Sequence, residues 1–115
     1  MVTNLFRRGL TDRVGVLWDS LHTYRHGEPP ALTWERIGAR VRHVHVKDSH
    51  RFSPDFFDLA LTGSGTMPIG DVITVLQEAG YDGFVDFEWE KAWHPEIEEP
   101  EIAIPQFIQY LRSLT

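Results

Sequence analysis

Three short apolar runs, separated by long connections, constrain this chain most. They cover residues 14–18, 41–46 and 84–89, and no tight hairpin turn joins one run to the next. Antiparallel neighbours can be joined by two residues, whereas parallel strands need a long crossover. The spacing therefore predicts an α/β fold with three parallel strands.

Helix signals fill the connections between the runs. Residues 68–79 begin at Pro68, keep apolar side chains on one face and stop before Gly80, which suits the end of a helix. Further helices are predicted at residues 34–39, with Thr33 as N-cap, and at residues 102–114. Residues 4–8 look like the end of another helix stopped by glycine. Residues 21–32 and 47–67 are predicted to be loops, because Gly and Pro interrupt them.

Polar and apolar side chains alternate on two of the predicted strands. His43 and His45 share one side of the second strand, and Asp86 and Glu88 share one side of the third. An open sheet covered by helices on both faces needs apolar residues on both sides, whereas a barrel tolerates polar groups facing its lumen. The alternation favours part of a barrel.

Each strand run also carries, at or beside its end, a residue that can bind a metal: Asp19, His45 and Glu88. The carboxyl ends of parallel strands lie on one rim, so these side chains are predicted to converge there. The chain has no cysteine, so any metal must be held by oxygen and imidazole ligands.

The composition is that of one small acidic domain. Of 115 residues, 42% are hydrophobic, and the formal net charge is -6 at pH 7. Lys and Arg are scattered among acidic residues, which argues against nucleic acid as a partner. No apolar run approaches the roughly 20 residues of a membrane span, and we expect a cytoplasmic protein with no membrane contact.

Four motifs in order carry a resemblance to a known family. They are GVLWDSLH at residues 15–22, RHVHVKD at 42–48, GSG followed by Met-Pro at 63–68, and GYDGFVDFE at 80–88; the likeness continues through 89–96 and 98–100. With these motifs the chain resembles the carboxyl-terminal portion of the xylose-isomerase-like TIM barrels, the sugar phosphate isomerase/epimerase group.

The resemblance implies a divalent metal site and a proton-transfer reaction. By motif position, Asp19, His45 and Glu88 look like the ligands of Mn²⁺, Mg²⁺, Co²⁺ or Zn²⁺, and the residue types do not choose among these ions. In the family the metal holds two adjacent sugar oxygens and stabilises an enediolate while a carboxylate moves the proton. Glu88 is the candidate acid/base group, and His22 resembles a substrate-binding histidine. Lys47 is expected to contact substrate at the mouth of the site or to form a surface ion pair with Asp48.

The chain also departs from the family. A complete (β/α)₈ barrel has about 250 residues, and strands one to five have no counterpart among these 115. The family's fourth ligand, a glutamate on strand five, is not found upstream of Val14. We therefore expect a partial TIM barrel, roughly strands six to eight with their helices, as a single incomplete domain over residues 1–115. Self-association or a complementing chain is expected, because open sheet edges favour assembly.

Two other functions stay open. The chain could be an inactive remnant or assembly subunit of such a barrel, or an endonuclease IV-like metal-dependent hydrolase, against which the negative charge counts.

Individual residues have structural alternatives too. Asp19 could simply cap a helix, His45 could be a core histidine, and for His43 a core position bonded to backbone is preferred. Gly63 and Gly65 resemble a phosphate cradle weakly and a turn more strongly. The tryptophans are predicted to be packing residues, although Trp93 could border a sugar ring. His26, His50 and His94 are predicted to be exposed.

Overall fold

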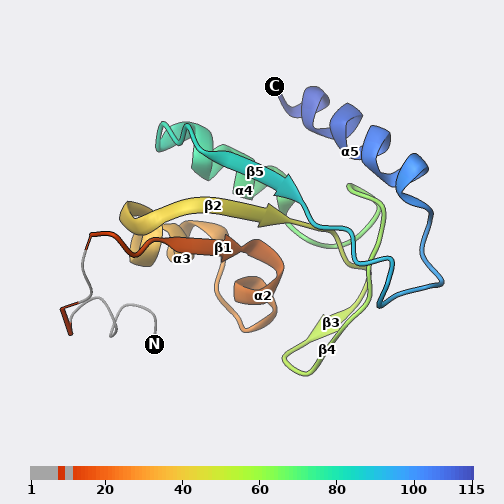
Figure 1. The fold of residues 1–115 in the computed structure, drawn as a ribbon, viewed down its shortest axis with the longest axis horizontal. Coiled ribbons are helices and arrows are strands. Elements are labelled where there is room, and N and C mark those ends of the chain that lie inside the picture. The colour runs from red at the N-terminus through yellow and green to blue at the C-terminus, as the bar shows by residue number, and fades with distance from the viewer. Residues whose placement is uncertain (1–7, 10–11) are drawn as a thin grey trace.

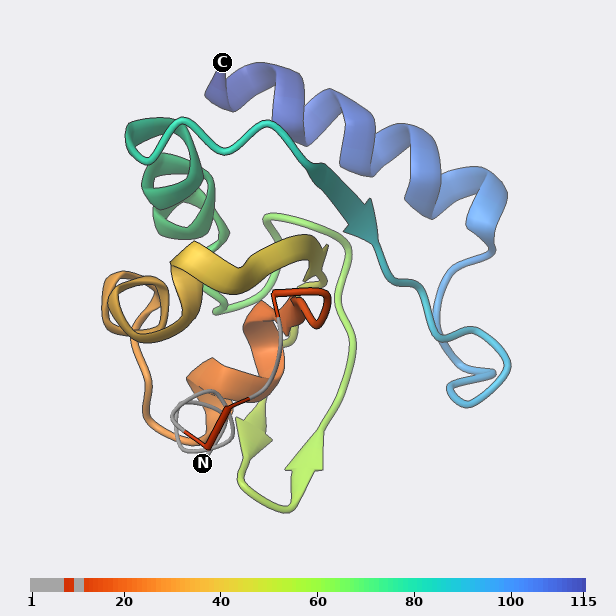
Figure 2. The ribbon, with the colours of Figure 1, turned by 60° about the vertical axis from the view of Figure 1, so that its left-hand side comes forward.

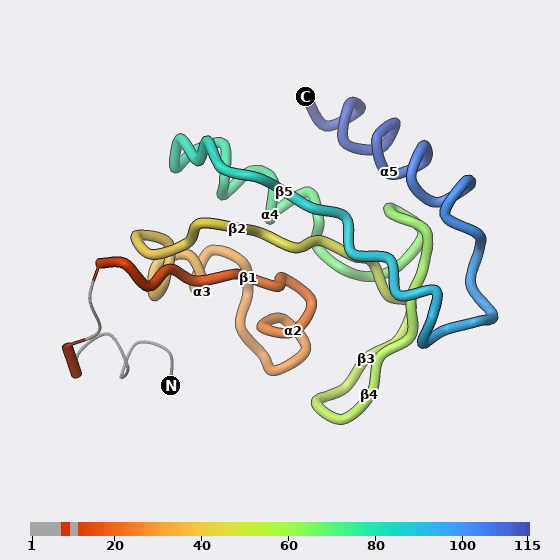
Figure 3. The backbone as a smooth tube through the Cα atoms, viewed as in Figure 1, coloured from red at the N-terminus to blue at the C-terminus, as the bar shows by residue number. Residues whose placement is uncertain are grey.

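The structure is a computed structural model that describes residues 8–9 and 12–115. Three strands form its main sheet, in the order β1 (Val16–Asp19), β2 (Val41–Val46) and β5 (Phe84–Phe87). Both neighbouring pairs are parallel. Figure 1 shows the three strands side by side, and the trace in Figure 3 shows that they run in the same direction. The predicted α/β fold with parallel strands is confirmed. Residues 4–7 of the predicted amino-terminal helix end lie outside the described residues.

The register of the sheet sets the site. Asp19 pairs with His45 across β1 and β2, and His45 pairs with Asp86 across β2 and β5. The first strand begins two residues later than predicted and includes Asp19, while the last ends at Phe87. Glu88 still donates its backbone N–H to the Val46 carbonyl at 3.2 Å, so it continues the line of β5.

The stretch predicted as a loop at residues 21–32 is largely helical, so that prediction is wrong. Helix α2 (Ser20–Arg25) starts directly after Asp19, and α3 (Pro30–Ile37) starts with proline in its first turn rather than at Thr33. Gly27, with φ of +92°, makes the turn between them. Proline has no N–H to lose at the first helical position, so it begins a helix as readily as it breaks one. The Thr33 hydroxyl donates to Glu28 instead of capping the helix.

The other helices agree better with the sequence. A short 3₁₀ turn, η1 (Gly38–Arg40), leads from α3 into β2. Helix α4 (Ile69–Glu78) ends before Gly80, whose φ is +67°, and α5 (Pro100–Leu114) starts two residues earlier than predicted. Among the described residues no helix is long and apolar enough to cross a membrane.

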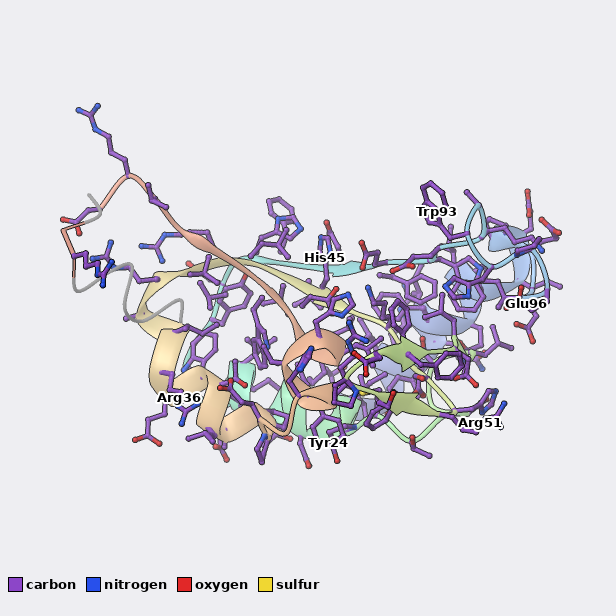
Figure 4. All side chains as sticks on the ribbon, turned by 90° about the horizontal axis from the view of Figure 1, so that it is seen from below. Tyr24, Arg36, His45, Arg51, Trp93 and Glu96 are labelled. Carbon is purple, nitrogen blue, oxygen red and sulfur yellow. The ribbon has the colours of Figure 1, made fainter. Side chains whose placement is uncertain are left out.

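The core lies on one face of the sheet. Val44 and Val46 of β2 are fully buried and belong to one apolar cluster with residues of α4 and of the β1–α2 segment. The further members of this cluster include Trp18, Leu21, Ile69, Val72, Leu76 and Phe107. Figure 4 shows α3 and α4 together on one side of the sheet, and Figure 2 shows α5 running alongside β5. The sheet is open among the described strands, as in part of a barrel.

The long connection after β2 is organised by a buried carboxylate. It contains a small hairpin, β3 (Phe52–Ser53) and β4 (Phe56–Phe57), and is otherwise irregular as predicted. Asp48 is 1% exposed and accepts four backbone N–H groups, at 2.8 to 3.1 Å. The donors are Ser49, Gly63, Gly65 and Met67.

Two expectations are corrected by this arrangement. Gly63 and Gly65 do not form a free phosphate cradle, because the Asp48 carboxylate already takes their N–H groups. Asp48 does not form a surface ion pair with Lys47, because both side chains are buried. A Cβ at Gly65 would lie 2.3 Å from Asp48 Oδ1, so glycine is required there for the close approach.

We expect Asp48→Asn to lower the free energy of unfolding by about 3 kcal/mol, since it leaves buried N–H groups without an acceptor at about 1–3 kcal/mol each. An amide has one acceptor oxygen, and its NH₂ group would face backbone donors. Denaturant unfolding followed by circular dichroism measures the change. Asp55→Asn, at an exposed position of the hairpin turn, is the matched control. Equal unfolding midpoints for the two variants would contradict the role given to Asp48.

Candidate metal centre

The three predicted ligands come together at the carboxyl ends of the strands. Asp19 ends β1, His45 lies near the end of β2, and Glu88 directly follows β5. One ligand atom from each lies within 4.8 Å of the other two. All three side chains are partly exposed, so a small ion has access. The predicted convergence on one rim is confirmed as geometry.

Asp19 has two structural partners. Its Oδ1 accepts the N–H groups of Leu21 at 3.1 Å and His22 at 3.3 Å, so Asp19 caps α2 as the structural alternative predicted. Its Oδ2 accepts a hydrogen bond from the Lys47 ammonium at 2.8 Å. The two hydrogen bonds to the helix end fix the carboxylate, and this leaves Oδ2 directed at the site.

Lys47 lies inside the site rather than at its mouth. The side chain is fully buried, and its Nζ donates to Asp19, to Glu90 at 2.9 Å and to Glu88. The Phe57 ring lies 5.6 Å from the same nitrogen. The prediction of a surface ion pair is therefore wrong. Burial by itself lowers the pKa of Lys47, but the hydrogen bonds to three carboxylates outweigh it and raise that pKa above the ordinary lysine value.

The same contacts act on Glu88. Burial pushes its pKa up, whereas the hydrogen bond and the charge of Lys47 pull it down further, so the net pKa lies below the usual value. Glu88 Oε1 lies 3.6 Å from His45 Nδ1, and Oε2 accepts from Lys47. Glu88 is therefore held as a carboxylate with one oxygen turned to the imidazole.

Glu90 is a member of the site that the sequence analysis did not single out. Its side chain is 19% exposed, with Oε1 on Lys47 and Oε2 3.6 Å from His94. The signal was available, since Glu90 follows Glu88 by two residues in extended chain and so faces the same way. His94, predicted to be exposed, is half-buried between Glu90 and Glu96.

His22 lies beside the triad, with Nε2 3.6 Å from Asp19 Oδ2. Its Nδ1 accepts from the Arg25 guanidinium at 3.0 Å, which keeps the ring neutral with its proton on Nε2. Burial lowers the pKa of His22, and the nearby Asp19 charge opposes this only in part. A neutral ring with an N–H directed at the site is suited to donate a hydrogen bond to a substrate oxygen.

The hairpin contributes an aromatic wall that sequence reasoning also missed. The Phe57 ring lies 5.3 Å from the ring of His22, 5.2 Å from the Arg25 guanidinium and 5.7 Å from the ring of His94. A cavity of about 500 Å³ is lined by Phe57 with its neighbours in the hairpin and by residues between 94 and 98. Two-residue strands have no periodicity, so the sequence offered no signal for them.

Two further expectations need correction. His43 is not a core histidine bonded to backbone; its side chain is 35% exposed and pairs with Asp86, Nε2 to Oδ2 at 2.5 Å. Trp93 is not a packing residue, because it is 82% exposed. Figure 4 labels His45 and Trp93 on the view of the sheet from below.

Comparison with known proteins agrees with this geometry. The model of the family described as "Xylose isomerase-like TIM barrel" matches residues 5–114. An inosose dehydratase of Lacticaseibacillus casei is 30% identical over 94 residues, covering 70% of this chain and 32% of that protein. A fructoselysine 3-epimerase of Escherichia coli O157:H7 is 25% identical over 91 residues, covering 79% of this chain and 31% of that protein. The chain thus spans about a third of the length of these relatives.

Solved structures share the fold. A xylose isomerase domain protein from Planctomyces limnophilus superposes with a TM-score of 0.70 at 19% identity, covering 98% of this chain and 42% of that one. A D-tagatose 3-epimerase-like protein gives a TM-score of 0.63 at 21% identity, covering 90% of this chain and 37% of that one. The three strands therefore correspond to part of a TIM barrel.

We expect Lys47→Met to lower the free energy of unfolding by about 2 kcal/mol, less than the roughly 3–5 kcal/mol of a fully buried broken pair because the carboxylates keep some water. Three carboxylates would be left close together without their cation. Denaturant unfolding in metal-free buffer measures the change. Lys91→Met is the control, since the Lys91 ammonium pairs with one carboxylate, that of the 63% exposed Glu99, and otherwise donates to the backbone carbonyls of Pro95 and Ile97. A loss at Lys47 no larger than that at Lys91 would show that the buried ammonium does not hold the site together.

Proposed function

The chain belongs to the xylose isomerase-like TIM-barrel family, and from this premise we propose that it carries the metal-binding rim of a sugar isomerase or epimerase. The convergence of Asp19, His45 and Glu88 on one rim carries the proposal. These three side chains would hold one divalent cation, for which Mn²⁺, Mg²⁺, Co²⁺ and Zn²⁺ are the candidates.

The residues present fit such a cation in donor type and in charge. Two carboxylates and one imidazole are the mixed oxygen and nitrogen set that these ions accept. Asp19, Glu88 and Glu90 carry three negative charges, and Lys47 neutralises one. With neutral histidines the remaining charge is minus two, which a divalent cation balances. Glu90 lies beside the triad and is also a candidate for the fourth metal ligand, a role that a glutamate on strand five has in the family.

The bound cation would polarise a carbonyl and a neighbouring hydroxyl of the sugar. Glu88, which is present as a carboxylate, would take the proton from the carbon next to the carbonyl. His22 would donate its Nε2 hydrogen bond to a substrate oxygen, and Lys47 would keep Asp19 and Glu88 in position. Phe57 would cover one side of the sugar and limit access of water.

The names of the relatives support a polyol or sugar derivative as substrate. One relative is an inosose dehydratase and the other a fructoselysine 3-epimerase, and both names describe substrates with several hydroxyl groups. The cavity beside Phe57 would provide room for the part of a substrate that does not react. A screen of ketoses and polyols, with and without a phosphate, identifies the substrate.

We further propose that residues 1–115 act as one incomplete barrel domain whose active form includes further strands. In the described part of the chain, β1 and β5 each have one edge without a strand partner. Such edges are completed by a second copy, a complementing chain or further barrel strands. Light scattering after size-exclusion chromatography distinguishes a monomer from an assembly.

We expect Mn²⁺ to bind the 115-residue chain at one site, and Asp19→Asn or Glu88→Gln to weaken binding by at least about tenfold, the effect that loss of even an outer-shell partner has. Isothermal titration calorimetry measures this, with Asp55→Asn as the control. At a metal concentration of a hundred times Kd, the parent chain should gain about 2.7 kcal/mol of unfolding free energy. Binding that is unaffected by either substitution, or no binding, would favour the inactive remnant.

Catalysis is tested separately by proton exchange. With metal in D₂O, the chain or its assembly should exchange the hydrogen next to the carbonyl of a ketose substrate, and Glu88→Gln should abolish the exchange. Proton NMR of the sugar measures it. Metal binding without exchange on any ketose would support an assembly subunit rather than an enzyme, and cleavage of abasic DNA would support the nuclease alternative.

A further inference from the structure

We propose a second divalent-cation position on the open face of the sheet, formed by His43, His45 and Asp86. It adjoins the triad described above, shares His45 with it and does not depend on the proposed sugar chemistry. One ligand atom from each of these residues lies within 4.8 Å of the other two. Metal–ligand distances of about 2.0–2.2 Å place the ligands of one tetrahedral zinc or cobalt ion about 3.4 Å apart, a separation within the 4.8 Å limit that these atoms meet.

The backbone holds the three residues in place. His43 and His45 are two residues apart on β2 and so point to the same face. Asp86 is the direct partner of His45 in the parallel ladder. The two imidazole rings lie 5.2 Å apart in an edge-on arrangement, and His43 Nε2 lies 2.5 Å from Asp86 Oδ2. Three donors therefore converge from two adjacent strands, without any contribution from a loop.

Stability does not account for this cluster. The side chains of His43 and Asp86 are 35% and 50% exposed. An ion pair at that exposure contributes little to stability. The same exposure leaves the donors open to an ion from solution.

The donor set also differs from that of the first position. It holds two imidazoles and one carboxylate, whereas Asp19, His45 and Glu88 hold one imidazole and two carboxylates. Imidazole-rich sites favour Zn²⁺ and Co²⁺, and carboxylate-rich sites also accept Mg²⁺ and Mn²⁺. Lys47 donates to Asp19, Glu88 and Glu90 and not to Asp86. The second position is therefore predicted to select Zn²⁺ or Co²⁺ over Mg²⁺.

The His43 imidazole provides a direct probe, because it belongs to the second position alone. In the 115-residue chain labelled with ¹⁵N-histidine, we expect Zn²⁺ to shift a ring nitrogen of His43 and Mg²⁺ to leave it unchanged. Asp86→Asn should weaken the Zn²⁺ dependence of this shift by at least about tenfold, on the same scale as a lost outer-shell partner. His26→Gln, which removes an exposed histidine on another element, should have no effect.

Asp19→Asn separates this inference from the proposed function. It should weaken Mn²⁺ binding and leave the Zn²⁺-dependent shift of His43 unchanged. The proposal is overturned if Zn²⁺ does not shift the His43 nitrogen, or if Asp86→Asn leaves the shift as it is in the parent chain. A shift lost in Asp19→Asn but kept in Asp86→Asn would also overturn it, since the ion would then sit in the first position alone. Circular dichroism of each variant confirms that it is folded.

Discussion

The parallel alignment of β1, β2 and β5 is the constraint on which the site depends. Asp19 and His45 face one another in the ladder, and a slip of one residue would turn every side chain of β2 to the other face. The apolar side of β2 prevents that slip, because Val44 and Val46 are fully buried against the helices. Packing beneath the sheet therefore positions the polar groups above it.

Side chains continue to alternate between the two faces of the sheet past the end of β2, and this places the opposite charges of Lys47 and Asp48 on different faces. Lys47 follows His43 and His45 on the polar side, where its ammonium donates hydrogen bonds to three carboxylates. Asp48 follows Val44 and Val46 on the helix side, where its carboxylate takes four backbone N–H groups. Adjacent residues of opposite charge would pair on a surface, but here each is buried with partners of its own. The Lys47 ammonium thus holds the carboxylates of the rim together, and the Asp48 carboxylate holds the loop that leads into α4.

The strands and the rim could be predicted from the sequence because both follow from periodicity. Apolar alternation identified the strands, and parallel strands place their ends together whatever the loops do. Helix α2 could not be predicted in this way: it has only six residues, and its signal is the cap on Asp19, which was weighed as an alternative to metal binding. The two roles are compatible, since one carboxylate oxygen serves each. The roles of Lys47 and Phe57 depend on contacts between distant segments, which no local pattern encodes.

On the uncovered face of the sheet, the side chains change from apolar to polar along the strands. The row nearest the amino ends places His43 between Leu17 and Phe84, which are 52% and 75% exposed. The next row is Asp19, His45 and Asp86, and Lys47 and Glu88 lie beyond it. In a TIM barrel the inward-facing side chains form packed layers, with functional groups at the carboxyl ends. Leu17 and Phe84 are thus the residues of an interior layer, and their exposure is the physical reason to expect further strands over this face. Such strands would bury the row of Leu17, His43 and Phe84 and leave the polar rows beyond it open at the mouth, where the proposed position of Asp19, His45 and Glu88 lies.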